Sequence, residues 1–353
     1  MISSKRIVGL EVLRAIAFIG VYLSHTRIEA FSEVGKFSVS IFLILSGFVT
    51  NLDLTNKEIN ILTIKDCFHY LKNRIKRLYP LHIITTLFMF PFVASTNNID
   101  DTIKSLVLLI LNVLLIVEWF PLGIRSINGP SWFLNTIVIA YIASPWLIKK
   151  IKSFNNRIII ISILILVIIE PLSSYYGYLY LDHNLFEWLV FSFPLIRLIE
   201  FVVGCFLGEL FIRKIYNIKY SNLVETLIVI VSLICIVVAQ QYKNEWWTYS
   251  LLYLLPSCFL IIVFSSSSGV ILKILSNKTL LFIASISSYA YLIHNVVFRY
   301  SVFLLYHIPI IGGHELYNKY NTYFRLFFGI PFTIMFSVIY KKLLKITKNC
   351  FVE

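Results

Sequence analysis

The sequence predicts an all-α integral membrane protein with about ten transmembrane helices and one re-entrant segment. Of its 353 residues, 58% are hydrophobic and only 14% are charged, whereas soluble domains carry about 25% charged residues. The mean hydropathy is +0.82, and the apolar residues form long runs separated by short basic linkers. Because the sequence contains no long polar insertion, low-complexity tract or evident repeat, we expect one membrane domain over residues 1–353.

Eleven hydrophobic segments follow one another along the chain, several of them near the length of about 20 apolar residues that spans a bilayer. The first begins like a signal peptide, because Lys5 and Arg6 precede its apolar run. Arg14 in its middle and the lack of a small-residue cleavage site predict instead a retained first helix. The segments lie near residues 7–28, 37–53, 78–95, 103–120, 131–148, 157–171, 194–213, 223–241, 247–265, 280–304 and 322–344.

The basic linkers predict the topology, because Lys and Arg concentrate on the cytoplasmic side. Residues 54–77 are strongly basic, which places this linker and the N-terminus inside. Strict alternation through eleven crossings would put the later basic clusters outside, whereas dropping one crossing between residues 78 and 148 puts them all inside. The sequence therefore predicts ten crossings and two cytoplasmic termini. The later clusters lie at residues 149–157, 213–219, 273–278 and 341–348.

The segment that fails to cross is expected within residues 103–130. It contains Lys104 and Glu118, and it is broken at Pro121 and at Gly129-Pro130. Such a segment can enter the bilayer and return only where protein buries its backbone. We therefore predict a re-entrant segment at this point of the chain.

The net charge of +13 does not indicate a nucleic-acid partner, because the cations cluster between hydrophobic runs, as expected at a membrane surface. The five cysteines show no Cys-x-x-Cys spacing, and several lie inside hydrophobic segments. Neither disulfides nor a metal site is expected. Membrane lipid is the partner that composition alone predicts.

Three ionisable side chains stand in the first hydrophobic segment, where such groups are costly and usually functional. Helical spacing places Glu11, Arg14 and His25 on one face. Glu11 lies one turn from Arg14 and can pair with it, which leaves His25 free to titrate. Arg14 and His25 are about 16 Å apart along the axis at the rise of an α-helix. We expect the cation in the inner half of the membrane and the imidazole near the outer end.

Five short motifs follow in order, each in an appropriate segment. They are the run Gly9–Ala15 with His25, the Ser46-Gly47-Phe48 run, the Arg74–Pro80 element, the Arg197–Gly204 helix and the Ser287–His294 helix. Together they resemble the acyltransferase 3 family of membrane acyltransferases, and the resemblance covers almost the whole chain. One such motif alone would be weak evidence, whereas five in order are specific.

One motif departs from the family pattern. Many members have Trp-x-Leu-x-x-Glu in mid-chain, whereas this sequence reads Trp132-Phe133-Leu134-Asn135 without the glutamate. The sequence here is similar to the Trp-Phe-Leu variant of the branch that modifies surface polysaccharides. The role of the family's glutamate is therefore not carried over. No SGNH-type domain follows, so a fused-domain mechanism is not expected.

The resemblance implies transfer of an acetyl group from acetyl-CoA to a sugar hydroxyl on the far side of the bacterial inner membrane. The acceptor would be O-antigen, capsule or exopolysaccharide, or its lipid-linked precursor. A sugar hydroxyl is a poor nucleophile near neutral pH and needs a base as it attacks the thioester. His25 is the expected general base, with a hydrogen-bonded structural histidine at the helix end as the alternative.

The resemblance places several residues near the donor. Arg14 would hold the carbonyl oxygen or a CoA phosphate, or line the donor's path; alternatively, it forms only a structural ion pair with Glu11. Arg74 and Arg77 lie one turn apart and suit the phosphates of CoA, or they anchor the helix to anionic lipid. Ser46 contacts the donor or only permits close helix packing.

The remaining candidates would bind or support the acceptor. Trp132 would stack on a sugar ring, or it belongs to an interfacial aromatic belt. Arg197 and Glu200 would orient sugar hydroxyls, or they only pair with each other. His294 is either a second acid/base group or a hydrogen-bonded core residue. Tyr289 is expected to support the site.

Two rival functions remain open from the sequence. A transporter or flippase for a lipid-linked sugar would also have broken helices and basic residues, but it would not consume acetyl-CoA. The second rival is a catalytically inactive scaffold of a polysaccharide complex, because the motif that ends at Asn135 departs from the family pattern. The acyltransferase is the leading hypothesis.

Overall fold

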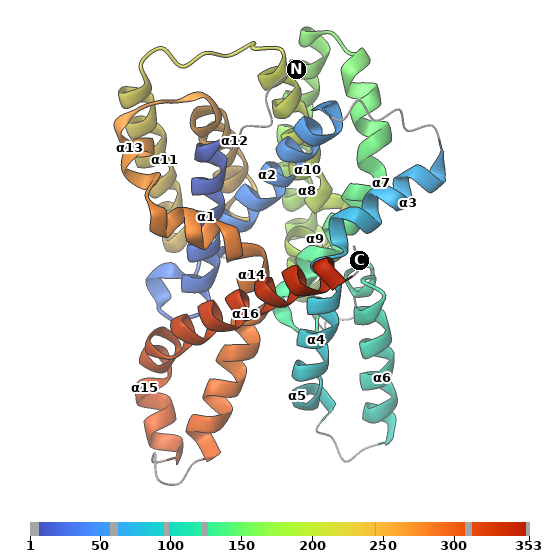
Figure 1. Cartoon of the computed structure of the whole chain (residues 1–353), viewed down its shortest axis with the longest axis vertical. Coiled ribbons are helices and arrows are strands. Elements are labelled where there is room, and N and C mark those ends of the chain that lie inside the picture. Colours follow the sequence, from blue (N-terminus) through green and yellow to red (C-terminus); the bar gives the residue numbers. More distant parts are fainter. Residues whose placement is uncertain are drawn as a thin grey trace.

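The computed structural model describes residues 7–56, 63–94, 99–121, 126–243, 245–307 and 313–350, and it is helical through most of these ranges (Figure 1). The α-helices are α1 (Val8–Ser24), α2 (Val34–Asn56), α3 (Ile64–Ile75), α4 (Tyr79–Met89), α5 (Pro91–Ala94), α6 (Ile99–Val113), α7 (Trp132–Ser153), α8 (Asn156–Tyr180), α9 (His183–Phe191), α10 (Pro194–Ile212), α11 (Ser221–Gln241), α12 (Leu251–Ser266), α13 (Val270–Leu275), α14 (Lys278–His307), α15 (Gly313–Phe327) and α16 (Gly329–Cys350). Short 3₁₀ turns are η1 (Glu29–Phe31), η2 (Val117–Trp119), η3 (Gly129–Ser131) and η4 (Trp246–Thr248).

Within the described residues, eight helical stretches are long and apolar enough to cross a membrane. A ninth candidate is formed by α3 with α4–α5, which are bent by 60° at their junction. The prediction of a multi-pass helical membrane protein is confirmed, while the number of crossings and the side of each terminus stay predictions. The eight stretches are Glu29–Asn56, Gly129–Ser153, Asn156–Tyr180, His183–Ile212, Ser221–Gln241, Trp246–Ser266, Lys278–Leu304 and Tyr320–Thr347.

Several predicted segments differ from the helices that form: 78–95 is divided between α4 and α5, and 322–344 between α15 and α16. The first, 7–28, is shorter in the structure, because α1 has 17 residues and ends at Ser24. The segment 103–120 does not form one helix: α6 has 15 residues and ends at Val113. Leu115 then adopts a left-handed conformation with φ 58°, which stops a helix of L-residues.

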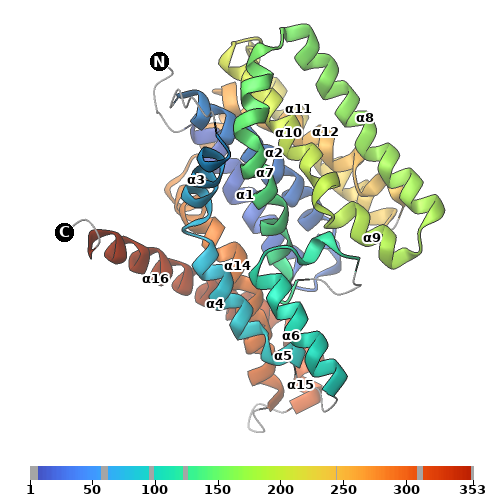
Figure 2. The same cartoon turned by 90° about the vertical axis from the view of Figure 1, so that its right-hand side faces the viewer.

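α6 returns alongside α4 and α5, and the three project together at one end of the molecule in both views (Figures 1 and 2). Its 15 residues, about 22 Å at the rise of an α-helix, are fewer than a bilayer crossing needs. Whether this segment crosses the membrane stays a prediction.

The first helix occupies the centre of the bundle. α1 contacts α2, α12 and α14, and its residues Val12, Ala15 and Ala17 are completely shielded. By contrast, α8, α11 and α16 expose rows of Ile, Leu and Phe. This distribution is typical of a membrane bundle whose outer helices face lipid.

The helices α2 and α10 pack closely against each other, and two glycines make this approach possible. A Cβ on Gly47 would collide with the backbone carbonyl of Phe201, and one on Gly204 with that of Ile44. Small residues at such crossings let helix backbones touch. The Ser46-Gly47 motif therefore has a packing role, whatever Ser46 contributes to a site.

Replacing Gly204 by alanine should destabilise the protein by about 1–3 kcal/mol, the usual effect of overpacking, because the added methyl would force α2 and α10 apart. Thermal unfolding of the detergent-purified protein measures this effect. Gly129→Ala is the matched control, since a Cβ there meets only Asn295 Nδ2 at 3.8 Å. Equal melting temperatures for the two variants would contradict the packing role.

Candidate active site: two cavities that meet at Tyr291

α1 carries its two candidate residues to different cavities. Arg14 lines a cavity of about 320 Å³, which we call the arginine cavity. His25, immediately after the end of α1, lines a second one of about 250 Å³, which we call the histidine cavity. The expectation that one helix presents a cation at one level and an imidazole at another therefore agrees with the structure.

The arginine cavity gathers five of the residues singled out from the sequence. They come from α1, α2, α14 and the junction of α3 with α4, and they are Arg14, Ser46, Arg74, Arg77 and Tyr289. Ser287 and Ser288 line it as well. Three guanidinium groups with several hydroxyls form a site suited to phosphate oxygens.

Two of these arginines also have acidic partners. Arg14 Nη1 lies 3.1 Å from Glu11 Oε1, and Arg74 Nη2 lies 2.8 Å from Asp53 Oδ2. Tyr70 accepts a hydrogen bond from Arg74 Nε at 2.8 Å. Arg14 and Arg74 keep 29% and 26% of their side chains exposed, so each guanidinium remains accessible beside its carboxylate. Arg77 is exposed at the cavity.

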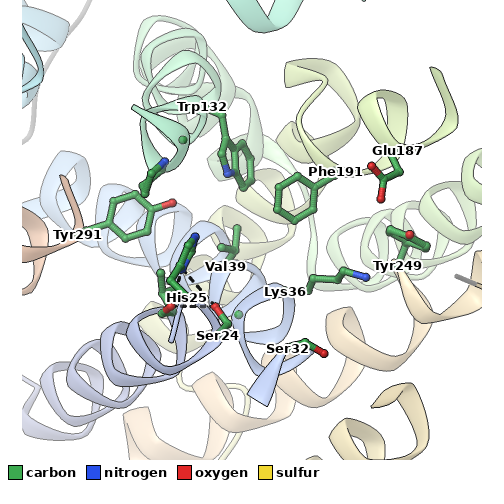
Figure 3. A pocket seen from close by; sticks show the side chains of 14 residues that line it. Ser24, His25, Ser32, Lys36, Val39, Trp132, Glu187, Phe191, Tyr249 and Tyr291 are labelled. Carbon is green, nitrogen blue, oxygen red and sulfur yellow. Dashed lines mark hydrogen bonds between the residues drawn. The ribbon is translucent and has the colours of Figure 1, made fainter. Parts of the chain in front are cut away.

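The histidine cavity combines aromatic, charged and hydroxyl side chains. Figure 3 shows His25 and Trp132 facing this space from opposite sides, with Phe191 beside Trp132. The rings of Trp132 and Phe191 are 4.9 Å apart. Lys36 from α2 and Glu187 from α9 line the same space. Such a mixture of flat apolar surfaces and polar groups is typical of a site for a small polar molecule.

Hydrogen bonding fixes the tautomer of His25. Its Nδ1 lies 2.8 Å from the carbonyl oxygen of Val21, and since a carbonyl only accepts, Nδ1 must carry the proton. Nε2 is then the lone-pair nitrogen available as a base.

Its surroundings favour the neutral form. His25 lies just outside α1; burial lowers the pKa of its imidazole, the bond to Val21 raises it, and the Arg325 guanidinium lowers it. A base must be unprotonated to act, so the net lowering keeps His25 competent near neutral pH.

His294 lies next to His25, although it lines neither cavity. The two ring centroids are 5.0 Å apart. His294 Nδ1 donates to the Ala290 carbonyl at 3.1 Å, and its buried Nε2 has no hydrogen-bond partner. His294, a candidate from the sequence, is therefore a neighbour of the candidate base. The lone-pair Nε2 atoms of His25 and His294 lie in one region.

Three aromatic rings stand where the two cavities meet. Tyr291 lines both of them, while Phe42 and Phe133 line the arginine cavity. The three ring centroids lie between 5.7 and 6.3 Å from one another. Val39, one turn before Phe42, and Trp132, next to Phe133, line the histidine cavity. The rings therefore separate the two cavities.

Arg197 and Glu200 lie outside both cavities, in a buried ion cluster. Arg197 Nη2 is 2.8 Å from Glu200 Oε2, and its Nη1 is 3.8 Å from Glu170 Oε1. Ser40 donates to Glu200. The cluster ties α2, α8 and α10 together, and Arg197 also lies 6.0 Å from the ring centroid of Trp132. The Arg197 guanidinium can therefore support the ring of Trp132.

Sequence reasoning missed several partners, because they come from distant segments. Asp53 compensates Arg74, and Glu170 completes the Arg197 cluster. Arg325 in α15 donates to the backbone carbonyl of His25 at 2.6 Å. Asn135, which follows Leu134 in the motif that lacks the family's glutamate, accepts from the Glu118 amide at 3.5 Å and so has a structural role. None of these contacts has a local signature.

Comparison with known proteins gives a family and a partial relative. The model of the family described as "Acyltransferase domain" matches residues 7–342. The "Acyltransferase MdmB" of Streptomyces mycarofaciens is 27% identical over 167 residues, which is 41% of this chain and 41% of that protein. The chain thus aligns with less than half of that relative's length. No solved structure matches.

Replacing Arg197 by methionine should destabilise the protein by about 3–5 kcal/mol, because two buried carboxylates lose their countercharge. Glu170→Gln is the control, since it removes one of the two carboxylates and leaves a single pair, with little expected loss. Thermal unfolding measures both. A stable Arg197→Met protein with weakened acceptor binding would instead assign Arg197 to the substrate.

Proposed function

The chain belongs to the acyltransferase 3 family, and on this basis we propose that it moves an acetyl group from acetyl-CoA to a sugar hydroxyl. The proposed acceptor is a surface polysaccharide, such as O-antigen, capsule or exopolysaccharide, or its lipid-linked precursor. The observation that carries the proposal is the pair of cavities meeting at Tyr291, one lined by arginines and the other by His25. Two chemically different substrates can approach one point from these two sides.

The arginine cavity suits the nucleotide end of the donor. CoA carries a 3′-phosphate and a diphosphate, which guanidinium groups bind with charge-assisted and often bidentate hydrogen bonds. Arg74 on α3 and Arg77 at the junction of α3 with α4 line this cavity, and Arg14 lines it from α1. We place the phosphates at Arg74 and Arg77 and the pantetheine arm along Arg14 toward the three rings, which must move apart to admit the thioester.

The histidine cavity suits the acceptor. Pyranose rings present C–H faces to aromatic side chains, and Trp132 and Phe191 offer such surfaces, while Lys36 and Glu187 can hydrogen-bond hydroxyls. Nε2 of His25 removes the proton of the attacking hydroxyl as its oxygen bonds to the thioester carbon. The carbon–sulfur bond then breaks, and the proton passes to the leaving CoA thiolate, which yields the ester and free CoA.

The basic linkers support a location in the bacterial inner membrane. In this proposal the arginine cavity faces the cytoplasm, where acetyl-CoA is made, and the histidine cavity faces outward. Both termini then lie on the cytoplasmic side.

His25→Ala should lower the rate of acetyl transfer by about 10²–10⁴-fold, the usual contribution of a positioned general base, while the protein stays folded in the membrane. The measurement follows acetyl-CoA consumption together with mass analysis of the glycan for added acetyl groups. His69→Ala is the control, because His69 is exposed on α3 and lines neither cavity. Normal transfer by His25→Ala would remove the base assignment, and transport without acetyl-CoA consumption would favour a carrier.

The double variant Arg74→Ala with Arg77→Ala should raise KM for acetyl-CoA by about 10–100-fold per lost charged hydrogen bond of 1.5–3 kcal/mol, with a smaller change in kcat. Lys72→Ala with Lys76→Ala removes the same charge from the same exposed region without touching the cavity. If both double variants behave alike, the two arginines act only as membrane anchors.

A further inference from the structure

Two hydrogen bonds join the end of α1 to α15, across about 300 residues of sequence. Arg325 Nη1 donates to the backbone carbonyl of His25 at 2.6 Å. In return, the Tyr22 hydroxyl donates to the backbone carbonyl of Arg325 at 2.8 Å. The bonds run in opposite directions, so each segment holds the other. His25 is thus fixed through its main chain, independently of its imidazole.

Arg325 itself is held from several sides. Its Nε donates to Asn321 Oδ1 at 2.8 Å, and its guanidinium lies 5.1 Å from the centroid of Phe298. Phe298 packs on Tyr22 with their centroids 4.9 Å apart. A Cβ at Gly329, the first residue of α16, would collide with the Tyr22 hydroxyl and the Phe298 ring. The α15–α16 segment is therefore fitted closely around the end of α1.

We propose that Arg325 is a positioning residue for His25, fixing the end of α1 so that Nε2 faces the acceptor. The inference rests on the proposed function, because it assumes that His25 is the base. The carbonyl end of a helix carries partial negative charge, which a guanidinium stabilises. With the carbonyl of His25 held by Arg325 and Nδ1 held by Val21, both the main chain and the ring have a defined orientation.

The charge of Arg325 acts on the same imidazole. In the described part of the chain, several titratable and charged groups lie around His25, in its cavity or packed beside it: Tyr22 on α1, Lys36 on α2, Glu187 on α9, Tyr249 after η4, Tyr291 and His294 on α14, and Arg325 on α15. Burial lowers the pKa of His25 most, the Val21 bond raises it, and Arg325 lowers it further. Removing the Arg325 charge should therefore raise this pKa. As the pH is lowered, His25 would then become protonated at a higher pH than in the wild type, and the rate of acetyl transfer would fall at that higher pH.

The test compares Arg325→Gln, Arg325→Lys and Tyr22→Phe in the membrane-embedded protein. Arg325→Gln should lower kcat by about 10–100-fold, the effect of a misplaced catalytic group, with KM for acetyl-CoA unchanged and the acid limb of the pH profile moved to higher pH. Arg325→Lys keeps the charge without the guanidinium, so kcat should fall while the limb stays in place. Tyr22→Phe keeps the ring contacts and should lower kcat without moving the limb.

Arg299→Gln is the matched control, because Arg299 also stacks on a phenylalanine, at 5.1 Å from Phe92, but does not contact His25. It should leave kcat and the pH profile unchanged. A wild-type kcat and pH profile in Arg325→Gln would overturn the inference. If that variant fails to fold, normal kcat in both Arg325→Lys and Tyr22→Phe overturns it. An inactive wild-type protein, or an active His25→Ala, would instead refute the proposed function.

Discussion

The rigidity of α1 is the constraint on which the site depends. The rise of an α-helix sets the axial distance from Arg14 to His25, the residue that caps α1, at about 16 Å, and α2, α12 and α14 pack around that helix. Neither residue can move toward the other without moving α1. If the arginine cavity binds the donor, as proposed, the donor must reach across a set distance, which favours a substrate with a long flexible arm and its reactive group at the tip.

The pairing of buried charges divides the arginines into two groups. An unpaired ion in an apolar interior is costly, so each must have a partner. Arg14 and Arg74 are paired but keep more than a quarter of their side chains exposed, which leaves donors for a ligand. The Arg197 side chain is only 5% exposed and faces two carboxylates. The first group suits substrate binding, and the second suits scaffolding.

Residue spacing in the sequence predicts features within one helix, but it does not predict contacts between distant segments. The structure places Arg14 on α1 and His25 immediately after its end, where they line different cavities, while their common face and membrane levels stay predictions. The end of α6 was not predicted, because hydropathy does not register the left-handed turn at Leu115. Arg325 and Glu170 could not be assigned either, since their partners lie far away in the sequence. Contacts of this kind are set by packing, for which a single sequence has no periodic signal.

The separation of the two cavities helps to distinguish an acyltransferase from a transporter. A carrier exposes one substrate site alternately to the two sides, so the same groups must bind the cargo in both states. Here the cavities differ in chemistry: three arginines line one, while an imidazole, one lysine and one glutamate line the other. A single cargo would not fit both. Two different reactants that meet at Tyr291 would fit the two cavities. The rings of Phe42 and Phe133 would keep water from the thioester until the donor arm displaces these rings.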